Sequence, residues 1–142
     1  MSTTKLFPID PSNLKHIKLI DDFVSENNGR TPIGFYQANE LSSNDINMEL
    51  VLEEKKKVRD ICHIQGYKDI KSCTISFAPK KAKKRKIVDM AVTYAMDTLG
   101  MEEVFLKINP EDEGMQAYLS SNEFECLGDE KGSIIYLKEK EC

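Results

Sequence analysis

The sequence lacks the features that mark membrane, secreted or zinc-binding proteins. No apolar run approaches the roughly 20 residues that a membrane-spanning helix needs. The first residues, MSTTKLFPIDPS, lack the charged-then-apolar pattern of a signal peptide. The four cysteines contain no Cys-x-x-Cys pair, and neither His16 nor His63 stands at ligand spacing from them. We therefore expect a cytoplasmic protein with no membrane partner and no metal site.

The chain also lacks the positive net charge that is typical of nucleic-acid-binding domains. It carries 20 Lys and Arg against 24 Asp and Glu, a formal net charge of −4. Basic residues crowd between Lys80 and Lys86, but no aromatic residues on which bases could stack are interleaved with them. A cationic loop on an acidic body suits a small anionic ligand better than a long polyanion. No nucleic-acid partner is expected, and a plainly solvated charge run stays an alternative for Lys80 and Lys81.

The composition is that of one compact domain. The 142 residues are 40% hydrophobic and 31% charged, as in ordinary globular proteins. This length can build a core of its own, and no repeat or linker interrupts it. We expect residues 1–142 to form a single domain.

Hydrophobic periodicity predicts a mixed α/β fold. Alternating patterns indicate strands at 5–9, 46–54, 58–67, 70–78 and 102–109 and a hairpin at 124–139, while three- and four-residue steps indicate helices from 14, at about 85–99 and at 110–124. The segment 30–45 has no clear pattern. The helix at 85–99 connects two strands by a crossover, which favours one parallel pair. The expected architecture is a mixed sheet of about seven strands with helices on both faces.

The order of these elements, and the text from Ser76 to Phe124, resembles the GNAT superfamily of acyl-CoA-dependent N-acyltransferases. Phe77, Ala78 and Pro79 fit the start of the family's core motif, and GMEEVFLKINPEDEGMQAYLSSNEF is similar to its later strand, turn and helix. The resemblance implies a GNAT-like fold, acetyl-CoA as the cofactor, and transfer of an acetyl group to an amine of a small molecule or a protein.

The sequence departs from the family pattern in its phosphate loop and at the family's tyrosine. The two motif glycines, which let backbone N–H groups approach pyrophosphate, are replaced by Arg85 and Ile87. We expect their side chains to crowd that approach and the neighbouring lysines to compensate with charge. The tyrosine position holds Leu119, with Tyr118 one place early. A catalytically silent module that binds CoA or a protein partner is therefore the alternative function.

The resemblance also implies cofactor-binding residues. The backbone of the strand end would pair with the pantetheine arm, the loop and helix start would hold the pyrophosphate, and the residue in place of a frequent family asparagine would lie nearby. These residues are, in that order, Ser76, Phe77 and Ala78; Lys83, Lys84, Arg85, Lys86 and Ile87; and Asp112.

Candidate catalytic residues come from two strands and one helix. Glu49 or Glu53 could act as the general base, and His63 has an intrinsic pKa suited to the same role. Tyr118 could protonate the leaving thiolate. A solvated strand face, a structural histidine and core packing of the tyrosine are the alternatives. The acidic body slightly favours a cationic amine acceptor, and a homodimer is one of the oligomeric states left open.

Overall fold

The computed structural model of the chain describes residues 4–10, 12–26, 45–55, 57–78 and 85–140. These residues form seven strands and three helices, and the second helix runs on into a π-helical turn, η1. In chain order they are β1 Lys5–Pro8, α1 Leu14–Glu26, β2 Asp45–Glu54, β3 Lys57–Tyr67, β4 Ser72–Ala78, α2 Arg85–Thr93, η1 Tyr94–Thr98, β5 Glu103–Ile108, α3 Glu113–Ser121, β6 Glu125–Glu130 and β7 Ser133–Glu139.

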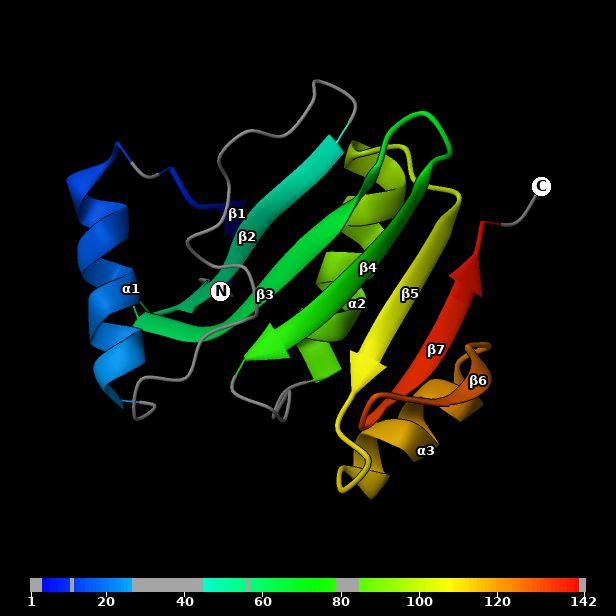
Figure 1. Cartoon of the computed structure of the whole chain (residues 1–142). Coiled ribbons are helices and arrows are strands. Elements are labelled where there is room, and N and C mark those ends of the chain that lie inside the picture. Colours follow the sequence, from blue (N-terminus) through cyan, green and yellow to red (C-terminus); the bar gives the residue numbers. More distant parts are fainter. Residues whose placement is uncertain (1–3, 11, 27–44, 56, 79–84, 141–142) are drawn as a thin grey trace.

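The strands form one mixed sheet in the order β1-β2-β3-β4-β5-β7-β6 (Figure 1). The pair β4–β5 is parallel and every other neighbouring pair is antiparallel. This arrangement confirms the predicted mixed sheet. The parallel pair lies where the helical crossover α2 connects two strands, as expected from chain order.

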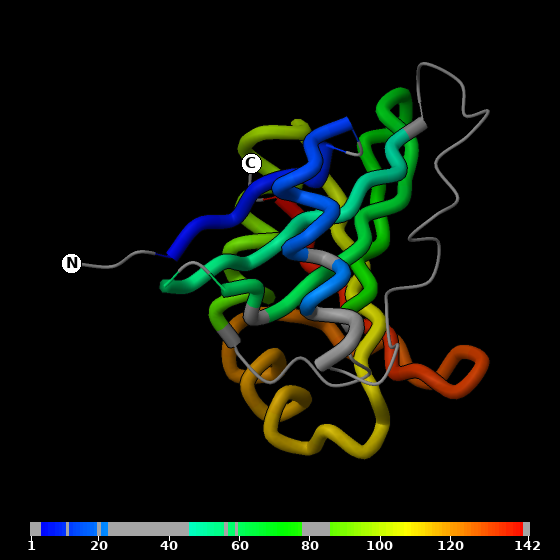
Figure 2. Tube along the Cα trace, turned by 90° about the vertical axis from the view of Figure 1, so that its left-hand side faces the viewer, coloured from blue at the N-terminus to red at the C-terminus, as the bar shows by residue number. Residues whose placement is uncertain are grey.

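Helices cover both faces of the sheet because the strands alternate apolar residues between two clusters. The larger cluster holds Leu50, Ile64 and Ile75 from the strands together with Val88 and Val92 from α2. Met115 and Leu119 of α3 belong to it as well, and Figure 2 shows α2 and α3 on the same side of the sheet. Full burial of each large aliphatic side chain contributes about 1.5–3 kcal/mol, so this face anchors the fold.

The opposite face carries a smaller apolar cluster at the β1–β3 end. Val51, Val58 and Ile61 are buried there, and Phe7, Ile9 and Leu19 pack against them. Leu19 comes from α1, which lies beside this end of the sheet in Figure 1. Toward β4 and β5 this face carries Thr74, Ser76 and Lys107, with Phe105 as an apolar neighbour.

The two helices after the basic run differ in detail from the sequence prediction. The buried face of α2 carries Val88, Ala91 and Val92, and Gly100 ends the helical region with a φ of 75°. However, the last turn, Tyr94–Thr98, is π-helical. Helix α3 begins at Glu113 rather than near Pro110, because Asp112 is its N-cap and accepts a hydrogen bond from the Met115 N–H at 3.1 Å.

None of the helices in the described ranges is long and apolar enough to cross a membrane. Cys62 and Cys73 are buried in strands β3 and β4, where they act as small core residues. Burial raises the pKa of the Cys73 thiol to about 12, so this thiol stays protonated and unreactive at neutral pH.

Candidate functional site

The parallel strands β4 and β5 separate before β4 ends. They pair from Ser72 with Glu103 as far as Ser76 with Lys107. Beyond that point Phe77 and Ala78 still pair with β3 but have no partner on β5 among the described residues. Figure 1 shows the carboxyl ends of the two strands diverging. Ligands of α/β sheets commonly bind outside the carboxyl ends of parallel strands, so this opening is the first element of the candidate site.

A row of polar side chains crosses four strands at the last paired position before the opening. Strand register places them opposite one another in sequence across the sheet: Glu49 of β2, His63 of β3, Ser76 of β4 and Lys107 of β5. At about 4.8 Å between neighbouring strands, the row spans about 14 Å. It lies on the face opposite α2, since the residues before and after it along each strand belong to the large apolar cluster.

Burial shifts the proton affinities of two members of this row. Glu49 is only 9% exposed, and its Oε1 has no hydrogen-bond partner in the described part of the chain. Loss of solvation therefore raises the pKa of its carboxyl from 4.5 to about 7, against a smaller opposing effect of its own backbone N–H. His63 is 4% exposed, and burial lowers the pKa of its imidazole. At neutral pH the row thus holds a neutral imidazole and a half-ionised carboxyl.

The ring of His63 is oriented by a neighbour on β2. Its Nε2 forms a short hydrogen bond with the Asn47 side-chain oxygen, so in the neutral ring Nε2 carries the proton and Nδ1 is left as the acceptor. An imidazole that is held in one tautomer and is neutral at physiological pH can accept a proton at Nδ1.

A hollow adjoins this row on the same face of the sheet. Its cavity volume is about 210 Å³, and its lining comes from three strands: His63, Gln65, Gly66 and Tyr67 of β3, Thr74 and Ser76 of β4, and Lys107 of β5. Most of these residues carry a side chain that can form hydrogen bonds, so the hollow suits a small ligand with polar groups.

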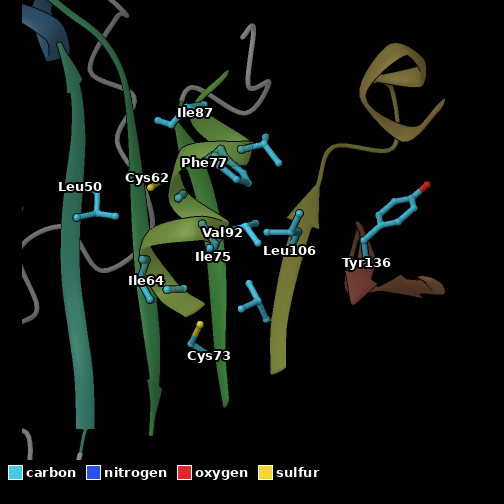
Figure 3. Close-up of a cluster of buried hydrophobic side chains, with 14 of the residues drawn as sticks. Leu50, Cys62, Ile64, Cys73, Ile75, Phe77, Ile87, Val92, Leu106 and Tyr136 are labelled. Atoms are coloured by element: carbon cyan, nitrogen blue, oxygen red, sulfur yellow. The ribbon is translucent and has the colours of Figure 1, made fainter. Parts of the chain in front are cut away.

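The start of α2 follows the opening, as expected for an anion site at a helix N-terminus. Residues 79–84, and with them Lys83 and Lys84, lie outside the described residues, as does the side chain of Arg85. The side chain of Ile87 is fully buried beneath α2 near Phe77 (Figure 3). The expectation that it would crowd a phosphate is wrong, because the helix turns it into the core.

Lys86 is occupied by another interaction. Its ammonium lies 3.6 Å from the Glu54 carboxylate and 3.4 Å from the Thr4 hydroxyl. These contacts tie the first turn of α2 to β2 and to the residue that precedes β1. They direct the Lys86 charge away from the opening, which argues against the phosphate role predicted for it.

Tyr118 lies on the other side of the sheet from the polar row, and Asp112 lies at the start of α3. The Tyr118 hydroxyl donates a hydrogen bond to Asp89 of α2 at 2.5 Å, and its ring packs on the large apolar cluster. Tyr118 and Asp89 line a second hollow between α2, α3 and β7. The Asp112 carboxylate caps α3, which gives it a structural role. The structure therefore unites Glu49, His63 and Ser76 but places Tyr118 and Asp112 apart from them.

Comparison with solved structures identifies the fold. The chain superimposes on the Campylobacter jejuni N-acetyltransferase PseH with a TM-score of 0.66 at 12% identity, over 97% of this chain and 99% of that one. The structure of PseH in complex with acetyl coenzyme A matches with the same TM-score and coverage at 13% identity. The spermidine/spermine N-acetyltransferase SpeG from Vibrio cholerae matches with a TM-score of 0.65 at 12% identity, over 94% and 91% of the two chains.

The chain has the GNAT fold. No protein-family model and no curated protein matches the sequence. The shared architecture is thus carried by topology and core pattern rather than by identity.

Within this GNAT fold, two residues of the site were not predicted from the sequence: Lys107 of β5, and Asn47, the hydrogen-bond partner of His63. Lys107 had a visible signal, since it is the polar residue between the buried Leu106 and Ile108. However, the residue that lies opposite Lys107 on β4 is set by strand register, which the sequence does not reveal. Asn47 likewise alternates with buried Ile46, but its hydrogen bond to His63 joins two strands. Among the described residues, no three His, Cys, Asp or Glu side chains gather as a metal site would require.

Proposed function

We propose that this chain is an acetyl-CoA-dependent N-acetyltransferase that transfers an acetyl group to an amine. The observation that carries the proposal is the opening between β4 and β5 immediately beyond a row that contains a half-ionised carboxyl and a neutral imidazole. The similar structures support it, since PseH and SpeG are N-acetyltransferases by name and PseH has been seen with acetyl coenzyme A.

The described residues fit the cofactor. Phe77 and Ala78 have no partner on β5, so their strand edge can accept an extended pantetheine arm as an added strand. Backbone N–H groups at that edge can polarise the thioester carbonyl, a contribution of roughly 3–4 kcal/mol when donors are aimed at a developing oxyanion. The first N–H groups of an α-helix have no partner within the helix, so the start of α2 can offer such groups and a positive dipole to phosphate. Lys83, Lys84 and Arg85 are proposed to add charge there.

Proton removal from the amine is assigned to the polar row. His63 lies one strand from the opening and Glu49 lies two strands from it. The raised pKa of Glu49, about 7, suits a base at neutral pH, and burial keeps the His63 imidazole in the neutral form that can accept a proton. The neutral imidazole is the nearer acceptor, and Glu49 can take the proton onward or accept it through water. Ser76, at the lip of the opening, completes the row that would orient the amine.

The test is a calorimetric titration with acetyl-CoA followed by a thiol-release screen over amines. The proposal expects saturable binding and amine-dependent release of CoA. Replacement of His63 or Glu49 by Gln should lower turnover while acetyl-CoA affinity is kept, because a base acts on the chemical step. A wild-type chain that ignores acetyl-CoA would overturn the cofactor assignment.

A silent CoA-binding module is the second candidate, and one arrangement favours it. The hydroxyl of Tyr118 is bonded to Asp89 on the far side of the sheet from the row, so the leaving thiolate lacks an evident acid in that row. In a silent module, CoA binds but no amine releases thiol. The same titration and screen therefore separate the two candidates.

A further inference from the structure

The charge around the hollow beside the opening indicates the chemical class of the acceptor. Among the seven described residues that line the hollow, Lys107 is the one basic or acidic residue besides His63, and burial favours the neutral form of that imidazole. The others offer hydroxyl, amide or backbone groups, and none of the described lining residues carries a carboxylate. The local charge is thus positive although the whole chain has a net charge of −4.

Lys107 lies on β5 beside the opening between the two parallel strands. It pairs with Ser76 at the last position before β4 and β5 separate. Its side chain is exposed, and it makes no hydrogen bond or ion pair with any other residue that the structure describes. By contrast, Lys71 and Lys86 are both engaged by glutamates. An exposed, unengaged ammonium at the lip of a polar hollow is a ready counter-charge for a ligand.

A polyamine or another multiply cationic acceptor does not fit this lining. A second ammonium group would need a carboxylate beside it, whereas Lys107 would repel it, and Glu49 lies three strands from Lys107 and does not line the hollow. The expectation from the acidic body, a cationic amine, is therefore replaced by the opposite preference at the site. The cavity of about 210 Å³ is also below the roughly 300–1,000 Å³ of pockets for drug-sized ligands, which favours a small metabolite.

Resting on the proposed function, we propose that the acceptor is a small amine that also carries an anionic group, a carboxylate or a phosphate, and that Lys107 binds this group. The amine then lies between the anion at Lys107 and the proton acceptors His63 and Glu49 along the row. Lys107 sets specificity through ground-state binding and takes no part in proton transfer.

The experiment compares matched amines with the full-length chain in the thiol-release assay. Glycine and L-serine are each paired with their carboxamides, glucosamine 6-phosphate is paired with glucosamine, and spermidine represents the cationic class. The ammonium group of an amino-acid amide is the more acidic of its pair, so intrinsic reactivity favours the amide. A preference for the carboxylate therefore reports binding. The carboxylate and phosphate arms show which anion the site takes.

The variants are Lys107→Gln, Lys107→Arg and the control Lys140→Gln, whose exposed lysine lines neither hollow. We expect Lys107→Gln to raise KM for the anionic amine at least about tenfold, equivalent to about 1.4 kcal/mol, with kcat, KM for acetyl-CoA and activity on neutral amines little changed. Arg should restore part of the affinity, and salt should weaken the wild type. A preference for neutral or cationic amines, or a rise in KM for acetyl-CoA instead, overturns the inference and leaves the proposed function standing.

If the chain binds acetyl-CoA but acetylates none of these amines, the proposed acetyltransferase function is refuted, and the anion site needs a separate test. The anion site is then judged by thermal shift in the presence of CoA. A shift with the anionic amines that Lys107→Gln removes supports the site, and the lack of such a shift overturns it.

Discussion

Replacing Glu49 with Gln tests the central electrostatic feature of the candidate site. The carboxyl has a pKa of about 7 in the folded protein, against an ordinary value of 4.5. At 1.36 kcal/mol per pKa unit, this difference corresponds to about 3 kcal/mol. Because the folded pKa is raised, the stability associated with the protonated form is fully present below pH 4.5 and is lost as pH rises to about 7. Above pH 7 the wild type carries the whole penalty.

Glu49→Gln should therefore abolish this pH dependence. Near pH 4.5 the amide and the protonated carboxyl are both neutral, so the two proteins should have similar free energies of unfolding. At pH 8 the variant should be more stable by up to about 3 kcal/mol. Urea denaturation between pH 4.5 and 8.5 measures the difference. The same variant should lose turnover, which is the stability–activity trade expected of a strained functional group.

Glu53→Gln is the matched control, since Glu53 lies on the same strand and on the same face of β2 but is only half-buried. It should leave the pH dependence of stability close to that of the wild type. If the gain in stability of Glu49→Gln over the wild type is no larger at pH 8 than at pH 4.5, burial does not raise the pKa of this carboxyl. Its proposed role as a general base at neutral pH would then be refuted.

Three further predictions concern the strand pair, the tyrosine and the basic loop. Gly66→Ala should cost about 1–3 kcal/mol of stability in urea denaturation, since its Cβ would lie 2.3 Å from the Ser72 carbonyl oxygen. Tyr118→Phe should lower turnover with little change in acetyl-CoA affinity if the hydroxyl protonates the leaving thiolate. Neutralising the loop cations together should weaken CoA binding by about 2 kcal/mol or more in calorimetry, increasingly so at low salt. Those cations are Lys83, Lys84 and Arg85.

Each of these predictions has a control. Gly114→Ala meets no atom closer than 3.9 Å and should not destabilise the chain. Tyr94→Phe, in the π-helical turn, should leave turnover unchanged, and an equally active Tyr118→Phe would remove that residue from the mechanism. Lys86→Gln should barely affect CoA affinity because its ammonium is held by Glu54. If the variant that lacks all three loop cations binds CoA with normal affinity, these cations are solvated and do not contact the cofactor.

The sequence predicted the faces of the strands but not their register. Alternation alone separated Cys73, Ile75 and Phe77 from their polar neighbours, because side chains of a strand point to opposite faces in turn. Alternation cannot show which residue of the next strand lies opposite. For this reason Glu49 and His63 could be named as separate candidates, whereas their alignment with Lys107 required the structure.

Local signals also misplaced details that depend on contacts between distant residues. A run of cations suggested a single phosphate-binding role, but Lys86 turns to Glu54, a residue far from it in sequence. Pro110 suggested a helix start, whereas the Asp112 cap set the start later. Ile87 stands in place of a motif glycine, which suggested that its side chain would crowd a bound phosphate. In the structure this side chain is buried in the core and does not reach the surface.

The single parallel pair has a consequence for how the site forms during folding. Strands β2, β3 and β4 are joined by short turns, so their pairing needs little loop closure. The β4–β5 pair forms only after the whole crossover through α2 has been closed, at a larger entropic cost. A partly folded chain can therefore align Glu49, His63 and Ser76 before the opening exists. A ligand that bridges β4 and β5 binds only the completed fold, and at 100 times its Kd it would stabilise that fold by about 2.7 kcal/mol.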